Sequence, residues 1–199
     1  MNTGVYMNGD AGKLITIGTL TAADVDEAYH IFETTIPEAY RQEGIGSLLD
    51  EIQEEIEHKK AVVQAVLQHE SDLEPTTTSP FFLVARKEGK VVGTISYGPC
   101  GKVVQECTNH RLDHVGTLGS LYILPELQGQ GIGSALITAL VTELQVRGIT
   151  QFCLDSGYRI AQQKWRRKFG DPYVVTKDYW GEGSENMVWL CEVQDFTGK

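Results

Sequence analysis

Two glycine-bearing segments have the residue types and spacing that hold phosphates in other proteins. Residues 40–49 read YRQEGIGSLL, and residues 127–136 read LQGQGIGSAL. In each segment a long polar side chain, Arg41 or Gln128, stands three residues before the first glycine of the shared GIGS. The amides at a helix N-terminus are unpaired and carry the positive end of the helix dipole. Glycine allows a phosphate to approach such amides closely.

The second segment has the better context for an anion. An apolar run at 115–124 predicts a strand that leads into it, and the apolar pattern of 134–148 predicts a well-packed helix behind it. No acidic residue lies between Gln128 and Ser134. In the first segment, Glu43 stands directly before Gly44 and would repel a phosphate. There the glycines are better interpreted as a bend between two helices.

The residues after the glycines narrow the kind of phosphate. None of them is a lysine, so the loop is not a nucleotide-triphosphate loop of the Walker type. Gly129 and Gly131 with Asp155 at the end of the next strand could form a dinucleotide-binding unit. Ser134 stands where that unit needs glycine or alanine, so this interpretation ranks second.

The elements that must position these residues can be read from periodicity. Residues 13–18 predict a strand, and residues 21–35 predict a helix, after which Pro37 could begin another. Residues 45–68 predict a long amphipathic helix, and residues 81–98 predict a hairpin. Strands at 115–124 and 149–156, a helix at 159–170 and two final strands complete the chain. The order predicts an α/β (α+β) chain with a mixed sheet, forming a single domain over 1–199 with 1–12 as a flexible arm.

Composition excludes several classes of function. The 199 residues carry a net charge of −10, which argues against a general nucleic-acid binder and is compatible with a cationic acceptor such as an amine. The four cysteines form no C-x-x-C pair, so we expect reduced thiols, no metal site and a cytoplasmic protein. Neither a signal-peptide core nor an apolar run of membrane-spanning length is present, so we expect no membrane partner.

The stretch LYILPELQGQGIGSALITAL resembles the acetyl-coenzyme-A signature of the GNAT-family N-acetyltransferases. That signature is Gln or Arg, two residues, Gly, one residue, then Gly or Ala, and Gln128, Gly131 and Gly133 fill it here. The resemblance extends over the order of elements from 13 to 193. It implies a mostly antiparallel sheet of about six to seven strands flanked by helices. The sheet would be splayed between its fourth and fifth strands, here 115–124 and 149–155.

The resemblance also implies a cosubstrate, a reaction and a set of contacts. Acetyl-CoA would donate an acetyl group to a primary amine of a small molecule or peptide, and a homodimer is compatible with the fold. Pantetheine would bond to the backbone around Leu121, Tyr122 and Ile123. The pyrophosphate would lie on the amides of Gly129, Gln130, Gly131, Ile132, Gly133 and Ser134.

The catalytic residues do not carry over from the family pattern. The position of the usual glutamate base is occupied by Thr117, and that of the usual tyrosine acid by Arg166. Asp155 is a local candidate for the base, although it could instead cap the next helix. Tyr158 could donate a proton to the departing thiolate, or simply pack. With both usual residues missing, a non-catalytic acyl-CoA-binding sensor stays open as an alternative function, as does a dinucleotide binder.

Three charged groups have two interpretations each. The basic run 164–168 could contact coenzyme A phosphates, but a solvated helix face with Trp165 buried is favoured. Glu51, Glu54 and Glu55 could attract a cationic substrate, but a solvated face is again favoured. His110 and His114 lack the cysteine or carboxylate neighbours of a metal site.

Overall fold

The structure is a computed structural model that describes residues 4–7, 14–72 and 79–196. Its strands are β1 (Gly4–Met7), β2 (Leu14–Thr19), β3 (Phe81–Lys87), β4 (Lys90–Gly98), β5 (Thr117–Ile123), β6 (Gln151–Ser156), β7 (Val174–Thr176) and β8 (Asn186–Glu192). Its helices are α1 (Val25–Gln42), α2 (Leu49–Asp72), α3 (Lys102–Cys107), α4 (Ile132–Val146) and α5 (Arg159–Phe169). Short 3-10 turns occur at Ala22–Asp24, Pro125–Leu127 and Val193–Phe196.

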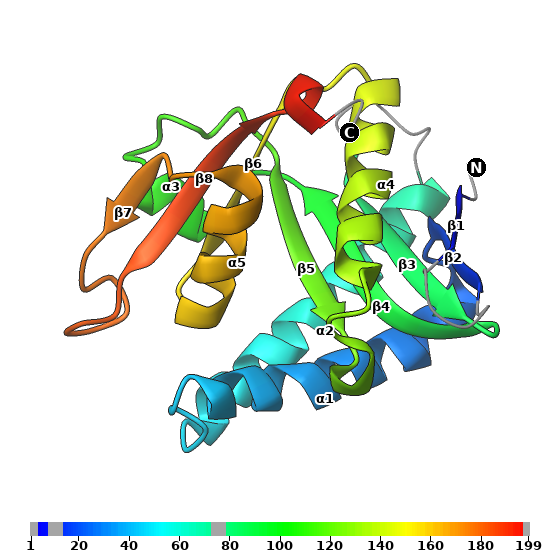
Figure 1. The fold of residues 1–199 in the computed structure, drawn as a ribbon, viewed down its shortest axis with the longest axis horizontal. Coiled ribbons are helices and arrows are strands. Elements are labelled where there is room, and N and C mark those ends of the chain that lie inside the picture. Colours follow the sequence, from blue (N-terminus) through cyan, green and yellow to red (C-terminus); the bar gives the residue numbers. More distant parts are fainter. Residues whose placement is uncertain (1–3, 8–13, 73–78, 197–199) are drawn as a thin grey trace.

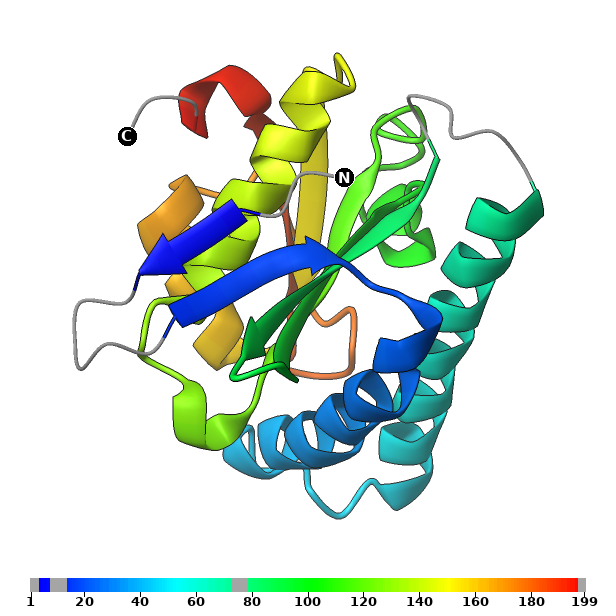
Figure 2. The same cartoon turned by 90° about the vertical axis from the view of Figure 1, so that its right-hand side faces the viewer.

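The described strands form one sheet in the order β1-β2-β3-β4-β5-β6-β8-β7. Only the β5–β6 pair is parallel, and every other neighbouring pair in this sheet is antiparallel. Helices α4 and α5 cover one face, and α1, α2 and α3 cover the other (Figures 1 and 2). The predicted fold class is therefore confirmed. The sheet has more strands than the six to seven expected, because β1 joins its edge.

The parallel pair is the place where the sheet divides. Strands β5 and β6 share one register pair, Thr117 with Cys153, and the Cys153 N–H donates to the Gly116 carbonyl at 2.9 Å. Beyond that point β5 pairs with β4 as far as Ile123, while β6 pairs with β8 as far as Ser156. The two strands thus diverge toward their carboxyl ends, above α1 and α2 in Figure 1. This confirms the predicted splay.

The start of the splay is fixed by a close contact. A Cβ atom added to Gly116 would lie 2.1 Å from the hydroxyl oxygen of Tyr97, whose ring is buried and packs against Phe81. The absence of a side chain at Gly116 therefore lets Tyr97 fill the space beside the strand junction. Because the interior is close-packed, this ring has no free volume into which to move.

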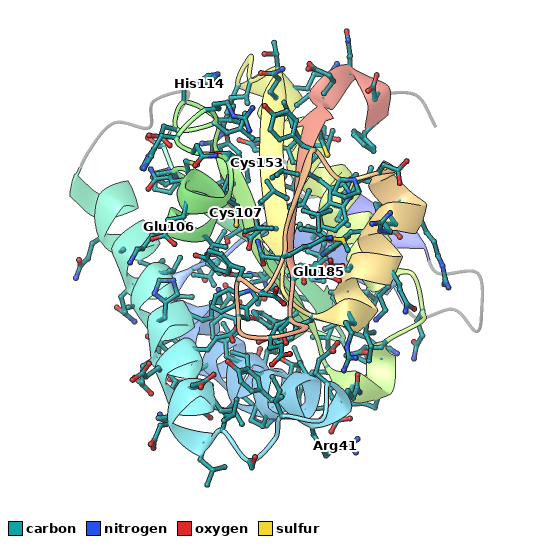
Figure 3. The ribbon with its side chains drawn as sticks, turned by 90° about the vertical axis from the view of Figure 1, so that its left-hand side faces the viewer. Arg41, Glu106, Cys107, His114, Cys153 and Glu185 are labelled. Carbon is teal, nitrogen blue, oxygen red and sulfur yellow. The ribbon has the colours of Figure 1, made fainter. Side chains whose placement is uncertain are left out.

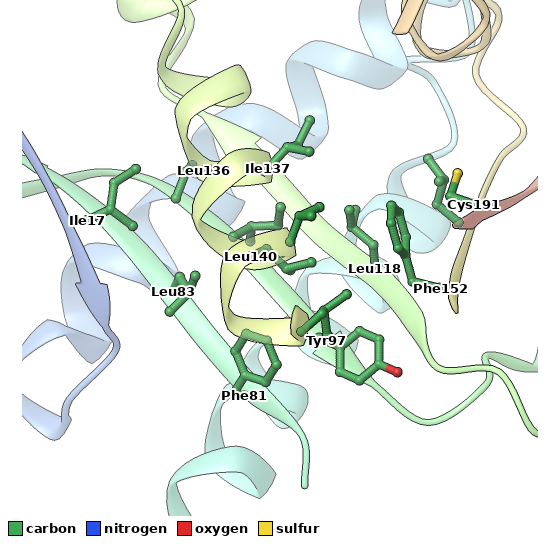
Figure 4. Close-up of a cluster of buried hydrophobic side chains, with 14 of the residues drawn as sticks. Ile17, Phe81, Leu83, Tyr97, Leu118, Leu136, Ile137, Leu140, Phe152 and Cys191 are labelled. Atoms are coloured by element: carbon green, nitrogen blue, oxygen red, sulfur yellow. The ribbon is translucent and has the colours of Figure 1, made fainter. Parts of the chain in front are cut away.

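Helix α4 is anchored deeply in the core, as its apolar sequence predicted. Leu136, Leu140 and Leu144 repeat every four residues and are fully buried (Figure 4). They pack with Leu118 of β5 and Phe152 of β6, on the two strands that diverge. The helix is thus held against both arms of the split, and its N-terminus is fixed relative to them.

On the opposite face, α2 lies along α1. Its buried residues Ile52, Ile56, Val63 and Val66 recur at helical spacing and contact the cluster that includes Phe32 of α1. The predicted long helix is confirmed, although it begins at Leu49 instead of residue 45. The first part of the expected buried stripe lies at the surface, where Leu49 is 70% exposed.

Three local expectations were wrong or incomplete. Pro37 does not begin a new helix: it lies inside α1, where the buried face continues through Ile36 and Tyr40 on either side of it. Gly4–Met7 is not a loose arm but pairs with β2, and the other residues of 1–12 lie outside the described part. Helix α3 falls in a stretch without amphipathic pattern. It is held by the burial of Val104 and Cys107 against the sheet.

The contact at Gly116 gives a stability prediction. We expect Gly116→Ala to lower the free energy of unfolding by about 1–3 kcal/mol, because the new methyl group overlaps Tyr97. Gly98→Ala is a matched control, since its Cβ would meet Pro80 at an ordinary 3.7 Å. Urea unfolding of both variants measures the difference, and equal stabilities would show that the junction tolerates expansion.

Candidate active site

The glycine loop turns the chain from β5 into α4. Gly129 and Gly131 have φ of 76° and 82°, in the left-handed region that favours glycine, and Gly131 is the N-cap of the helix. Ile132 comes next and is 2% exposed, so the first helical residue is fixed in the core while the loop before it faces solvent.

The helix start presents unpaired amides to that solvent. The first helical bond runs from the Ala135 N–H to the Gly131 carbonyl, at 3.0 Å. The amides of Ile132, Gly133 and Ser134 therefore precede the regular helical ladder. The first turn of α4 contains no acidic residue. An anion such as a pyrophosphate fits this position, where dipole and donors act together.

The two glutamines of the loop fix its shape. The Gln128 side-chain amide donates to the Ile123 carbonyl at 3.1 Å, and that of Gln130 donates to the Glu126 carbonyl at 3.2 Å. Both side chains thus tie the loop back to the end of β5 and the turn after it. Their side-chain contacts support the loop itself, and a phosphate would meet the backbone that they position.

Strand β5 is irregular beside the split. Ser120 has φ of 49°, and the register with β4 shifts between Thr94 and Ser96. The Thr94 hydroxyl donates to the Ser120 carbonyl at 2.7 Å and holds this bulge. A bulge re-aims the residues beyond it. Leu121 and Ile123 consequently pack on the α4 side, while Tyr122 packs on the α1–α2 side.

Asp155 lies on the other arm of the split, near the end of β6. Its carboxylate accepts a hydrogen bond from the Asn186 side-chain amide at 3.3 Å. Burial raises the pKa of Asp155, and the Glu55 carboxylate adds to this, whereas the Asn186 bond and the Lys59 charge oppose it. Asp155 does not cap α5, because the N-cap of that helix is Tyr158. The capping alternative is therefore wrong, and a half-buried carboxylate faces the α3 side beside the split.

Asn186 is held in turn by an aromatic side chain. The Trp180 indole N–H donates to the Asn186 side-chain oxygen at 3.1 Å, which leaves the amide hydrogens for Asp155 and for the Cys107 sulfur at 3.6 Å. A Cβ at Gly157 would lie 2.4 Å from the Trp180 Nε1, so a side chain there would displace the indole from its bond to Asn186. Figure 3 looks onto this side of the molecule, with Cys107 and Cys153 near its centre.

Tyr158 joins this arm to α2. Its hydroxyl donates to the Glu55 carboxylate at 2.7 Å, and its ring packs edge-on against Tyr40 with centroids 5.7 Å apart. Burial, and after it the Glu55 charge, raises the pKa of Tyr158. Tyr158 therefore both packs and forms a hydrogen bond. Because Tyr122 of β5 also donates to Glu55, the two tyrosines meet at the same carboxylate.

Glu55 is the functional candidate that the sequence pattern undervalued. Besides Tyr158, its carboxylate accepts hydrogen bonds from the hydroxyls of Tyr122 at 2.9 Å and Tyr40 at 3.1 Å. Glu51 and Glu54 are exposed, as a solvated face predicts. The available signal was position: Glu55 lies between Ile52 and Ile56 of the buried stripe, on the side of α2 that turns inward.

The positions of the missing family residues have structural roles. Thr117 accepts a bond from the Gly101 N–H at 3.0 Å and lies 3.4 Å from the Cys153 sulfur. Burial raises the pKa of Cys153 to about 12, which makes its thiol inert at neutral pH. Arg166 is exposed and pairs with Asp171 at 3.1 Å. The basic run is thus a solvated face, with Trp165 half-buried against Phe169.

The first GIGS segment is a bend, as predicted, and it has a binding partner within the chain. Gly44 has φ of 80° in the turn between α1 and α2. The Glu43 carboxylate accepts a bond from the Ile160 N–H at 2.9 Å and lies 3.4 Å from Arg159. It therefore occupies the N-terminus of α5, where a negative charge is favourable. The residue that excludes a phosphate from its own loop caps another helix.

Two further features of the described residues bear on function. No three His, Cys, Asp or Glu side chains gather as a metal site within that part of the chain. His110 pairs with Asp113 at 3.0 Å on the surface. None of the described helices has the length and apolar character needed to cross a membrane.

A sheet that parts at one parallel pair, with the unpaired amides of a helix N-terminus beside the opening, offers a site for a phosphate-bearing ligand. Residues 50–170 match the family model described as the acetyltransferase (GNAT) family. The chain therefore belongs to the GNAT family and is an acyltransferase. Enzymes of this family use acetyl-CoA as donor, which the amides at the start of α4 fit.

Comparison of folds agrees with this assignment. A structure from Desulfovibrio desulfuricans described as a GNAT-family acetyltransferase has a TM-score of 0.65 at 18% identity, covering 90% of this chain and 99% of that one. The PaiA N-acetyltransferase of Thermoplasma acidophilum, in complex with coenzyme A, gives 0.63 at 18%, covering 88% and 98%. A ribosomal-protein-alanine N-acetyltransferase from Brucella melitensis gives 0.61 at 22%, covering 88% and 98%. A comparison with curated proteins finds no match.

The burial of Asp155 predicts a pH-dependent gain in stability for Asp155→Asn. Because the pKa is raised on folding, the charged carboxylate destabilises the folded protein above the folded pKa, and this cost vanishes below the unfolded pKa. We expect the variant to unfold at a higher temperature than wild type near neutral pH, by a few degrees. The difference should shrink as the pH falls, in thermal unfolding monitored by circular dichroism. No gain at any pH would show that the carboxylate is stabilised where it lies.

Proposed function

We propose that the protein transfers an acetyl group from acetyl-CoA to a primary amine of a small molecule or peptide. The observation that carries this proposal is the split between β5 and β6. One arm ends in the unpaired amides of α4, and the other ends in Asp155, a carboxylate whose pKa is raised. These two features support a donor bound on one side of the opening and a proton acceptor on the other.

The donor end consists of the loop and β5. The amides of Ile132, Gly133 and Ser134 would hold the pyrophosphate, with Gly129, Gln130 and Gly131 shaping the approach. The backbone of Leu121, Tyr122 and Ile123 would run beside pantetheine, because β6 has left this edge of β5. Both strand edges need partners when buried, and an amide-bearing chain such as pantetheine supplies them.

The chemical step needs a proton acceptor for the amine. The bound ammonium first gives one proton to Asp155, directly or through water, and the neutral amine nitrogen then attacks the thioester carbonyl carbon. The carbon–sulfur bond breaks, the amide forms, and the second proton lost by the nitrogen goes to the departing coenzyme A thiolate. A pKa raised by burial brings Asp155 closer to the range in which a base works near neutral pH. Holding amine and thioester together supplies much of the remaining rate.

Tyr158 as proton donor to the thiolate remains a prediction that its surroundings weigh against. Its hydroxyl already donates to Glu55, and its raised pKa makes it a weak acid.

A cytoplasmic location is part of this proposal and is supported by the four free cysteines. One continuous sheet supports treating residues 1–199 as a single domain.

Calorimetric titration with acetyl-CoA tests the donor site. We expect binding at micromolar strength that Gly131→Glu abolishes, because the new side chain strains a left-handed position and brings a negative charge to the phosphates. Gly89→Glu is the matched control, since Gly89 has the same φ of 82° in the β3–β4 turn. Absence of binding by the wild type would overturn the proposed function.

Asp155→Asn tests the assignment of the base. With an amine found by a thiol-release screen, we expect kcat to fall about 100- to 10,000-fold while acetyl-CoA still binds. The wild-type rate should rise with pH through the pKa of Asp155, and the variant should lack this limb. Asp171→Asn, which removes a carboxylate from the surface, should leave kcat unchanged. Acetyl-CoA binding without thiol release for any amine would favour the non-catalytic sensor.

A further inference from the structure

Glu55 is surrounded by neutral hydrogen-bond donors from three separate parts of the chain. Tyr40 comes from α1, Tyr122 from β5 and Tyr158 from the start of α5, and each donates its hydroxyl hydrogen to this one carboxylate. The three contacts join residues 15, 67 and 103 positions apart in the sequence. We call these four residues the Glu55 cluster. Such a convergence is not the chance contact of a solvated helix face.

The charge of Glu55 has no salt-bridge partner among the described residues. Other carboxylates of the protein have one: Asp24 pairs with Arg86 at 2.6 Å, and Glu143 pairs with Arg147 at 2.8 Å. Lys60, on the same helix as Glu55, pairs with Glu33 and Glu57 instead. Phenol hydroxyls stabilise a carboxylate but leave its charge in place. Lys59, one turn further along α2, adds a positive charge to this region but forms no ion pair with Glu55 among the described residues. A partly buried carboxylate without an ion-pair partner favours binding of a cation.

The geometry of the donors also selects the kind of cation. A phenol has a single hydrogen, and in each tyrosine that hydrogen is engaged by Glu55. The remaining lone pairs of the three phenol oxygens can therefore only accept hydrogen bonds. Together with Glu55 they form a set of acceptors with no free donor. A primary ammonium group, which has three N–H donors and no acceptor, is complementary to such a set.

The cluster lies beside the split. Tyr122 belongs to the strand expected to run along pantetheine, and Tyr158 lies three residues after Asp155 at the end of the other arm. The hydrogen bonds of Tyr122 and Tyr158 to Glu55 therefore join both arms of the split to one carboxylate. An ammonium held at Glu55 would lie beside the strand along which pantetheine is proposed to run.

We propose that the Glu55 cluster binds the primary ammonium group of the acceptor. This inference rests on the proposed function and assigns the acceptor-recognition residues of the same site. Helix α2 supplies the charge, and the tyrosines set its orientation. The net charge of −10 would add long-range attraction for a cationic acceptor.

The test uses the coenzyme-A-saturated protein, so that no turnover occurs, and two probes of equal charge. Butylamine presents a primary ammonium, and N,N-dimethylbutylamine presents an ammonium with a single N–H. We expect saturation-transfer NMR titrations to show that the wild type prefers butylamine. Glu55→Gln should weaken butylamine binding at least about tenfold, because the ammonium loses a bond to a charged acceptor.

Glu54→Gln is the matched control, since it makes the same change at the adjacent, exposed position of α2. It should bind butylamine as the wild type does, and thermal unfolding should show both variants folded. Equal binding by wild type and Glu55→Gln, no binding by the wild type, or equal affinity for the two probes would each overturn the inference. Coenzyme A binding is measured in parallel. A wild-type protein that does not bind coenzyme A would contradict the proposed function instead of this inference.

Discussion

The parallel bridge between Thr117 and Cys153, with a hydrogen bond from the Cys153 N–H to the Gly116 carbonyl, marks where β5 and β6 part, and the geometry of the site depends on it. From this point toward their carboxyl ends the two strands no longer pair with each other. There β5 is held by β4, and β6 is held by β8. Along the edges of β5 and β6 that face each other, the backbone N–H and C=O groups beyond the bridge therefore have no strand partner. Buried edges without partners are costly, so the opening is stable only with water or a ligand in it. The split therefore offers unpaired backbone groups to a ligand, as the proposed function requires.

The parting is supported from both faces of the sheet. On one side the leucines of α4 pack against β5 and β6 together, which keeps the arms from separating further. On this same side Tyr97 fills the space that Gly116 leaves beside the strand junction, and on the opposite face Val104 and Cys107 of α3 pack against Cys153 of β6. Because α4 carries the glycine loop at its start, the same packing fixes the unpaired amides relative to the opening. The packing of the core thus also determines where the proposed donor-binding amides lie.

Two kinds of carboxylate can be distinguished by their partners, which are arginines for one kind and neutral donors for the other. Asp24 and Glu143 have arginine partners and lie where they stabilise the fold. Asp155 and Glu55 have neutral partners, an amide for one and three phenols for the other. Neutral donors orient a carboxylate without neutralising it, which leaves charge available for a substrate at a cost in stability. Such a cost is expected where stability and activity conflict.

Sequence patterns predicted the features that are local in the chain. The strand, glycine loop and helix from 115 to 148 adjoin one another, so spacing indicated an anion site at the start of α4. The splay and the coenzyme A donor were implied by the family resemblance. The Glu55 cluster could not be predicted in this way, because its hydroxyls come from residues up to 103 positions away. The same holds for Glu43, which caps a helix 117 residues further on. The prediction of a new helix at Pro37 was wrong because α1 continues through this residue. The burial of Ile36 and Tyr40 stabilises the helix there, and helix propensities do not take such tertiary packing into account.

This difference between local and distant contacts has a consequence for how the enzyme is built. The donor site depends on one contiguous segment, whose glycines and amides have few acceptable substitutes. The proposed acceptor site depends on α2, which contributes Glu55 from outside the sheet and contacts it through side chains. Changes at the inward positions of α2 can therefore alter the charge beside the split while the loop and α4 stay as they are. On the proposed assignment, acceptor preference depends on residues of α1 and α2, whereas donor binding depends on β5 and α4.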